Sequence, residues 1–200
     1  MTKVLVAGAI CLVLLGCEST AEPFQLVEFK PPPEGLVAGS PDAQTVLVEF
    51  GSHGCPGCRK LVDSVWPSLD EQFVKSKQVH YQYLEAGSPH LDPLAAFVEC
   101  ESVSRGVFAA RARLNWLIAN AKDSLATMLT ASTCANSGAR KIRRREERSL
   151  AERMKIRGTP SIILGRRHGD GRVVGWVIVG ALPRDSLLTL VRYATEVTNR

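Results

Sequence analysis

The sequence lacks a hydrophobic run long enough to span a membrane, clustered metal ligands and a strong charge imbalance. Its most apolar stretch, residues 4–15, falls short of the roughly 20 residues that a transmembrane helix needs. The four histidines are scattered, and the net charge is only +5. The basic run at 140–145 has no interleaved aromatic residues that would stack on bases, and it is interrupted by Glu146 and Glu147, which is typical of a solvated helix face. We therefore expect no resident metal and no nucleic-acid partner.

Two cysteines separated by two residues stand out against these absences. Cys55 and Cys58 follow an apolar run and open a predicted helix. A thiol at a helix start lies near backbone N–H groups and the positive end of the helix dipole, which favour the thiolate. We therefore predict that Cys55 is a nucleophile and that Cys58, one helical turn along, can form or resolve a disulfide with it. A pair with this spacing also occurs as half of a zinc site, so the pair alone does not decide the chemistry.

The N-terminus predicts export. Residues 1–16 are predicted to be a signal peptide, with Lys3 before a short apolar run. Its end, Leu14-Leu15-Gly16-Cys17, resembles the lipobox of bacterial lipoproteins. The resemblance implies that Cys17 is lipidated and becomes the new N-terminus, with acyl chains that hold the protein on a membrane. We expect a lipid-anchored protein of the bacterial cell envelope that faces the periplasm or extracytoplasmic space. A secretory peptide cleaved elsewhere is the alternative.

The cysteine count predicts a second pair. Setting aside Cys11 with the signal peptide and Cys17 with the lipid leaves four of the six cysteines in an exported domain. Because Cys55 and Cys58 pair by adjacency, Cys100 and Cys134 remain to form a structural disulfide in an oxidising compartment. Two separate buried thiols are the alternative.

The periodicity of apolar residues predicts an order of strand, helix, strand, helical block, strand, strand and helix. After the signal peptide, residues 17–40 are predicted to hold the lipidated cysteine, a tether and an entry strand, and residues 41–199 one domain with a helical insertion at about 92–155. The predicted strands are Phe24–Phe29, Thr45–Phe50, Val79–Leu84, Ser161–Leu164 and Arg172–Val179. The predicted helices are Cys58–Phe73, kinked or divided at Pro67, then Pro93–Glu101, Ser104–Ala121, Asp123–Thr130 and Ser137–Met154, with breaks near Ser102 and Thr133, and a last helix from Pro183.

This order and three motifs resemble the DsbA-type branch of the thioredoxin fold. The motifs are Cys55-Pro56-Gly57-Cys58 at a strand-to-helix turn, Gly158-Thr159-Pro160 just before a strand, and Glu49 six residues before Cys55. The resemblance implies an α/β fold, a central mixed sheet flanked by helices, and thiol:disulfide oxidoreductase activity. It implies that Pro160 is cis, that Thr159 and Pro160 align the substrate chain, and that Glu49 takes a proton from Cys58. A solvent-facing Glu49 and a trans Pro160 are the alternatives from the residues alone.

Other residues around the motif leave the direction of electron flow open. Pro56-Gly57 differs from the Pro-His of strongly oxidising members of the family. His53 would stabilise the Cys55 thiolate if it turned inward, but we favour a half-exposed ring. Three tryptophans, Trp66, Trp116 and Trp176, are interpreted as packing residues.

We favour disulfide donation to exported proteins, with no cofactor beyond the Cys55–Cys58 disulfide. A membrane or periplasmic redox partner would recycle the site, and we expect a monomer. Reduction or isomerisation of disulfides is the alternative within the same chemistry. A copper chaperone with Cys55, Cys58 and His53 as ligands is the alternative from another class, because soft thiolates select Cu(I).

Overall fold

The computed structural model describes residues 25–120 and 138–198 and has a six-stranded mixed sheet at its centre. The strand order is β1-β6-β5-β3-β4-β2, in which β3 and β4 are parallel neighbours and the other neighbouring pairs are antiparallel. The strands are β1 (Gln25–Phe29), β2 (Leu36–Ala38), β3 (Thr45–Gly51), β4 (Val79–Glu85), β5 (Ser161–Arg167) and β6 (Val173–Val179). All five predicted strands are therefore present. The short edge strand β2 was not predicted, because three residues between glycines carry almost no periodicity.

The strands β3 and β4 form the predicted βαβ unit. Every residue of both strands is buried, as expected for apolar runs covered on both faces. Their crossover consists of α1 (Pro56–Ser64), α2 (Trp66–Leu69) and a π-helical turn, η1 (Asp70–Val74). Pro67 lies in the first turn of α2, so the predicted division at this proline is confirmed. The crossover places the start of α1 beyond the carboxyl end of β3.

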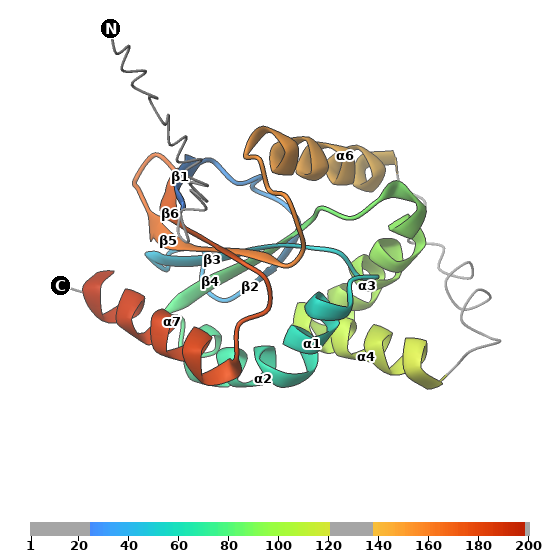
Figure 1. Cartoon of the computed structure of the whole chain (residues 1–200), viewed down its shortest axis with the longest axis horizontal. Coiled ribbons are helices and arrows are strands. Elements are labelled where there is room, and N and C mark those ends of the chain that lie inside the picture. The colour runs from blue at the N-terminus through green and yellow to red at the C-terminus, as the bar shows by residue number, and fades with distance from the viewer. Residues whose placement is uncertain (1–24, 121–137, 199–200) are drawn as a thin grey trace, which may run out of the picture.

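Helices cover both faces of the sheet (Figure 1). The helix α6 (Gly138–Arg153) lies on one face and packs against a cluster that includes Val48, Phe50 and Leu150. On the other face lie α1, α2, α4 (Val107–Asn120) and α7 (Arg184–Thr198), around a larger apolar cluster. Side chains along β3 alternate between the two faces, so the same strand contributes Val48 to one cluster and Leu47 to the other.

The helical block between β4 and β5 differs in detail from the prediction. A 3₁₀ turn, η2 (Pro89–Leu91), leads into α3 (Asp92–Arg105), and α3 ends at Gly106 rather than near Ser102. Gly106 has a φ of +79°, which ends the helix, whereas the Ser102 hydroxyl donates to the carbonyl of Glu99 and is accommodated inside the helix. The predicted helix Asp123–Thr130 and break near Thr133 lie outside the described residues, as do residues 1–16 and Cys17.

The basic run in α6 is not simply a solvated face. Arg144 and Glu147 are only 2% and 3% exposed. Arg144 and Arg143 each form an ion pair at 2.8 Å with Glu99 of α3, and Arg143 also pairs with Glu147 at 3.2 Å. The prediction of a solvated helix face is therefore wrong for these residues, because carboxylates on neighbouring elements compensate the buried charge.

The tryptophans divide between core and surface. Trp66 is buried, but Trp116 and Trp176 are 61% and 51% exposed, so the prediction of packing residues is wrong for two of the three. Within residues 25–120 and 138–198, no helix is both long and apolar enough to cross a membrane.

Candidate redox site

The end of β3 and the start of α1 position the two cysteines. Cys55 has an extended backbone and caps α1, and its Sγ accepts a hydrogen bond from the backbone N–H of Cys58 at 3.4 Å. Both thiols are free in this structure: Cys55 is partly exposed, whereas Cys58 is buried at 1% exposure. A substrate can therefore reach only Cys55 directly.

The surroundings of Cys55 favour its thiolate. Burial raises the pKa of this thiol, but hydrogen bonds from the side chain of Thr159 and the backbone N–H groups of Cys58 and Gly57 outweigh burial and lower the pKa below that of an ordinary cysteine. In the thiol form, Sγ of Cys55 donates to the Thr159 carbonyl at 3.2 Å. These contacts meet the condition for a reactive nucleophile.

Cys58 has the opposite environment. Burial, and after it the charge of Glu49, raises the pKa of the Cys58 thiol well above its ordinary value. Its Sγ accepts one hydrogen bond, from the backbone N–H of Ser52 at 3.5 Å. The pair is therefore strongly asymmetric, with one thiol prepared to ionise and the other kept protonated.

The loop before β5 lies against the cysteines. The Thr159–Pro160 peptide bond is cis, as predicted, and a Cβ added at Gly57 would come within 3.0 Å of Cδ of Pro160. The carbonyl of Pro160 accepts a hydrogen bond from the N–H of Gly180 at 2.8 Å, which ties this loop to the end of β6. Glycine at position 57 thus allows the Cys55–Cys58 turn to approach Pro160 closely.

Glu49 lies beneath the cysteines in an ion pair that the sequence analysis did not foresee. Its carboxylate is completely buried and accepts two hydrogen bonds from Arg111, at 2.6 Å on Oε2 and 2.8 Å on Oε1. The hydroxyl of Tyr81 donates to Oε2 at 2.6 Å. A carboxylate offers about four lone pairs, so one on Oε1 remains available. The solvent-facing alternative for Glu49 is therefore excluded.

Arg111 is the functional residue that the sequence analysis missed. It lies on α4, is 2% exposed, and its guanidinium carbon lies 4.5 Å from the centre of the Tyr83 ring. The buried residues of α4 fall on one face of the helix, at Val107, Ala110, Arg111, Leu114 and Leu117. An arginine within such an apolar stripe is a signal for a buried partner of opposite charge.

His53 is buried rather than half exposed. Its ring stacks on Tyr83 with 4.7 Å between ring centres, and its Nε2 lies 3.8 Å from Oε2 of Glu85. Burial, and after it the positive charge of Arg111, lowers the pKa of His53 well below its ordinary value. The half-exposed prediction is wrong because the turn after β3 directs the ring against β4. The hydrogen bonds that lower the pKa of Cys55 come from Thr159, Cys58 and Gly57, so they do not involve His53.

A second group of buried carboxyls continues from His53 toward α6. Glu85 accepts hydrogen bonds from the Tyr83 hydroxyl at 3.0 Å and the Gly87 N–H at 2.7 Å, and its own N–H donates to Glu147 at 2.9 Å. Burial is the largest cause that raises the pKa of Glu85 to about 7, and the same holds for Glu147. These two carboxyls therefore titrate near neutral pH.

We predict that the Glu85→Gln variant changes how stability depends on pH. A carboxyl with a raised folded-state pKa contributes stability that is present below its unfolded pKa of 4.5 and is lost as pH rises through about 7. The Glu85→Gln variant avoids this loss, so its stability relative to the wild type should rise by about 2.5 kcal/mol between pH 5 and pH 8. Urea unfolding at both pH values measures this gain. The exposed Glu152→Gln variant is the control, and an equal shift in both variants would contradict the prediction.

The remaining predicted site residues concern disulfide pairing and metal binding. Cys100 of α3 is disulfide-bonded, whereas Cys134 lies outside the described residues, so their pairing stays a prediction. Among residues 25–120 and 138–198, no group of three or more His, Cys, Asp and Glu side chains is placed to hold a metal ion. The third ligand of the copper alternative, His53, faces Glu85 instead.

Comparisons with known proteins agree with this geometry. Three solved structures share the fold over most of their length. The alpha-DsbA1 protein of Wolbachia pipientis is 14% identical, with a TM-score of 0.63 over 84% of this chain and 94% of that chain. BdbD of Bacillus subtilis is 16% identical, with a TM-score of 0.61 over 85% of this chain and 98% of that chain. ScsC of Proteus mirabilis is 20% identical, with a TM-score of 0.57 over 80% of this chain and 72% of that chain. No curated protein sequence matches the chain.

The fold predicted from the sequence is confirmed by these structures and by a family model. At such low identities the solved structures show the fold alone, which is the thioredoxin fold with a helical insertion seen in DsbA proteins. The family model, described as a thioredoxin-like domain, matches residues 36–195 and thus most of the chain. The chain therefore belongs to the thioredoxin-like domain family, with a fold of the DsbA type.

Proposed function

We propose that this protein is a thiol:disulfide oxidoreductase that donates disulfides to exported proteins and is anchored to a membrane through lipidated Cys17. The asymmetry of the cysteine pair carries the proposal. The accessible Cys55 is held by groups that favour its thiolate, next to the cis-Pro160 loop, and the buried Cys58 stays a thiol. A structural disulfide or a solvated metal ligand needs no such difference between its two sulfurs.

Donation starts from the Cys55–Cys58 disulfide. A client thiolate attacks Sγ of Cys55, the Cys55–Cys58 bond breaks, and Cys58 leaves as a thiolate that takes up a proton. A second client thiolate then attacks the client sulfur of the mixed disulfide and releases the Cys55 thiolate. The client loses two electrons and forms its disulfide, and the cysteine pair gains them and is reduced. Thr159 and Pro160 are proposed to align the client chain.

The proton that Cys58 needs must reach a buried sulfur. Glu49 is the acidic group whose charge acts most on this thiol, and the free lone pair on its Oε1 can hold a proton in transit. A Cβ at Gly51 would lie 3.0 Å from this oxygen, so glycine leaves Oε1 uncovered at the end of β3. Arg111 and Tyr81 fix the orientation of the carboxylate during this transfer.

The reduction potential of the Cys55–Cys58 pair tests the direction of transfer. A stabilised Cys55 thiolate favours the reduced form, which makes the disulfide oxidising, so we expect a potential closer to the roughly −120 mV of DsbA than to the roughly −270 mV of thioredoxin. Equilibration with glutathione, read by thiol alkylation, gives the value. The Thr159→Val variant removes one hydrogen bond to the thiolate and should be less oxidising. A potential at or below that of glutathione would overturn disulfide donation in favour of reduction.

A further inference from the structure

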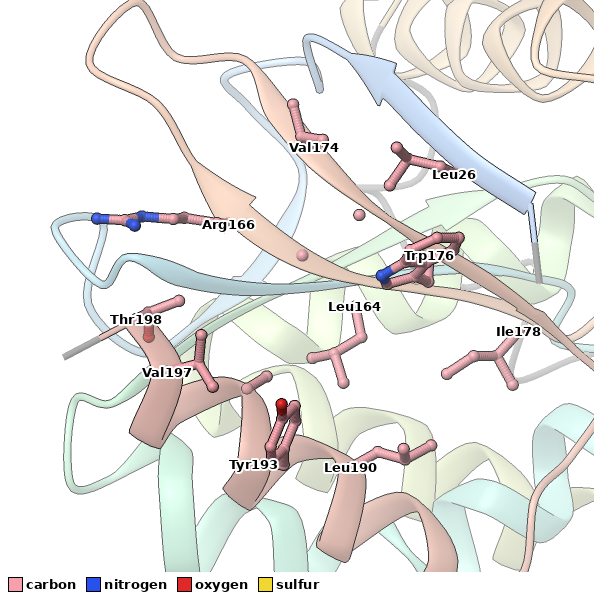
Figure 2. Close-up of a pocket in the computed structure, with 13 residues that line it drawn as sticks. Leu26, Leu164, Arg166, Val174, Trp176, Ile178, Leu190, Tyr193, Val197 and Thr198 are labelled. Atoms are coloured by element: carbon pink, nitrogen blue, oxygen red, sulfur yellow. The ribbon is translucent and has the colours of Figure 1, made fainter. Parts of the chain in front are cut away.

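An apolar groove lies on the face of the sheet that carries α7, between that helix and the outer strands (Figure 2). Its volume is about 560 Å³. The strand side is a row of Leu26, Trp176 and Leu164, which are neighbours across β1, β6 and β5. The side chains of Tyr193 and Val197 face this row from α7 (Figure 2).

The floor of the groove is bare because two glycines are paired there. Gly165 of β5 and Gly175 of β6 are opposite each other. A Cβ on Gly165 would lie 2.3 Å from the carbonyl oxygen of Val174, and one on Gly175 would lie 2.6 Å from that of Leu164. The strands therefore approach too closely for any other residue, and the groove stays open beside Trp176.

Four large side chains of the groove are exposed, with exposures of 55% for Leu26, 51% for Trp176, 68% for Tyr193 and 51% for Val197. Such a contiguous apolar surface is unusual unless something covers it. The groove does not belong to the redox site. Its β5 residues Leu164 and Arg166 pair with Leu47 and Thr45 near the start of β3, whereas the cysteines follow the far end of that strand, roughly 17 Å away along its length.

The chain that precedes β1 indicates what covers the groove. Leu26 is the second residue of β1, and Cys17 precedes the first by eight residues. Even fully extended, eight residues span at most about 29 Å, so a lipid on Cys17 would keep this edge of the sheet near the bilayer. Trp176 and Tyr193 have apolar rings with a polar tip, the side chains that are enriched at membrane–water interfaces. Arg166 at the groove adds a positive charge.

We propose that this groove is the surface through which the anchored protein lies on an anionic phospholipid bilayer, an inference that rests on the proposed anchoring at Cys17. The exposed apolar and aromatic side chains enter the interfacial region, and Arg166 contacts lipid phosphates. The cysteines follow the far end of β3 from the groove, so this contact leaves them free to meet exported clients.

Vesicle binding by the proposed mature chain from residue 17, made as Cys17→Ser, tests the groove without the anchor. We expect vesicles of phosphatidylcholine and phosphatidylglycerol that carry brominated acyl chains to quench tryptophan fluorescence. Quenching should be lost in Trp176→Phe and kept in Trp116→Phe, because Trp116 is at least as exposed, at 61% against 51%, but lies on α4. Val197→Ser should weaken binding by about tenfold, whereas Val103→Ser on α3 should not.

Several outcomes overturn the groove proposal. The first is that the vesicles do not quench tryptophan fluorescence, and the second is that quenching falls equally in Trp116→Phe and Trp176→Phe. The third is that the groove binds a second copy of the chain or an apolar peptide and does not bind vesicles. Thiol exchange, measured on the same samples, should be unchanged in Val197→Ser. If exchange is absent while quenching persists, the proposed oxidoreductase function fails and the groove proposal stands.

Discussion

The Cys58→Ala variant should accumulate client proteins joined to Cys55 by a disulfide. In this variant the Cys55 thiolate attacks a client disulfide, one client sulfur joins Cys55 and the other leaves as a thiolate. The mixed disulfide then persists, because the Cys58 sulfur that would displace the client from Cys55 is missing. Turnover of disulfide donation should fall to the uncatalysed rate, because the variant cannot form the internal disulfide that is donated. Nonreducing electrophoresis of cell-envelope proteins, followed by mass spectrometry, detects the adducts.

Two matched variants separate this trapping from nonspecific oxidation. Cys55→Ala should give no adducts, because its remaining thiol is buried and kept protonated. The double variant, with both cysteines replaced, should also give none. Adducts that form equally well through Cys58 alone would contradict the assignment of Cys55 as the nucleophile, and a complete absence of adducts in Cys58→Ala would count against the oxidoreductase proposal.

The Arg111→Met variant should lose about 3–5 kcal/mol of stability and slow the attack of Cys58 on a mixed disulfide. Methionine leaves the buried carboxylate of Glu49 without the cation that donates two hydrogen bonds to it. The negative charge of Glu49, which already raises the pKa of Cys58, is then less neutralised. Urea unfolding gives the first quantity, and stopped-flow measurement of mixed-disulfide resolution gives the second.

A second buried arginine provides the control for Arg111. Arg144 is also 2% exposed and pairs with Glu99 at 2.8 Å, but this pair joins α6 to α3 rather than underlying the cysteines. Arg144→Met should therefore lose stability without slowing resolution by Cys58. Adding Glu49→Gln to Arg111→Met should recover part of the stability, because no unpaired charge remains. Equal slowing in Arg111→Met and Arg144→Met would refute a positioning role for Arg111.

The order of elements and the reactive pair could be predicted because both depend on local sequence signals. Apolar runs with period two or 3.6 mark the strands and helices, and Cys55 and Pro160 lie in short motifs. The partners of charged residues could not be predicted in this way. Glu49 and Arg111 are 62 positions apart, and their contact exists only once α4 packs on the sheet. The burial of Arg144 likewise depends on Glu99 from another helix.

Two other predictions, the exposure of His53 and the position where α3 ends, were wrong because a specific contact or backbone conformation outweighed the usual behaviour of the residue type. A histidine in a turn is usually partly exposed, but His53 stacks on Tyr83 beneath the turn. The serines near position 102 suggested a break, yet the helix continues until Gly106 adopts a positive φ. In both places the outcome depends on the conformation of a few backbone angles, which composition does not specify.

The contact between Arg111 and Glu49 bears on whether this domain can be divided or recombined. A smaller redox protein made by deleting the helical insertion would keep the cysteines, Glu49 and the proline loop, but it would bury Glu49 without a counterion. Exchanging the insertion for that of another protein would have the same defect unless the replacement offered a cation at the position of Arg111. An engineered variant should therefore keep three residues together, which come from both parts of the domain: Glu49, Tyr81 and Arg111.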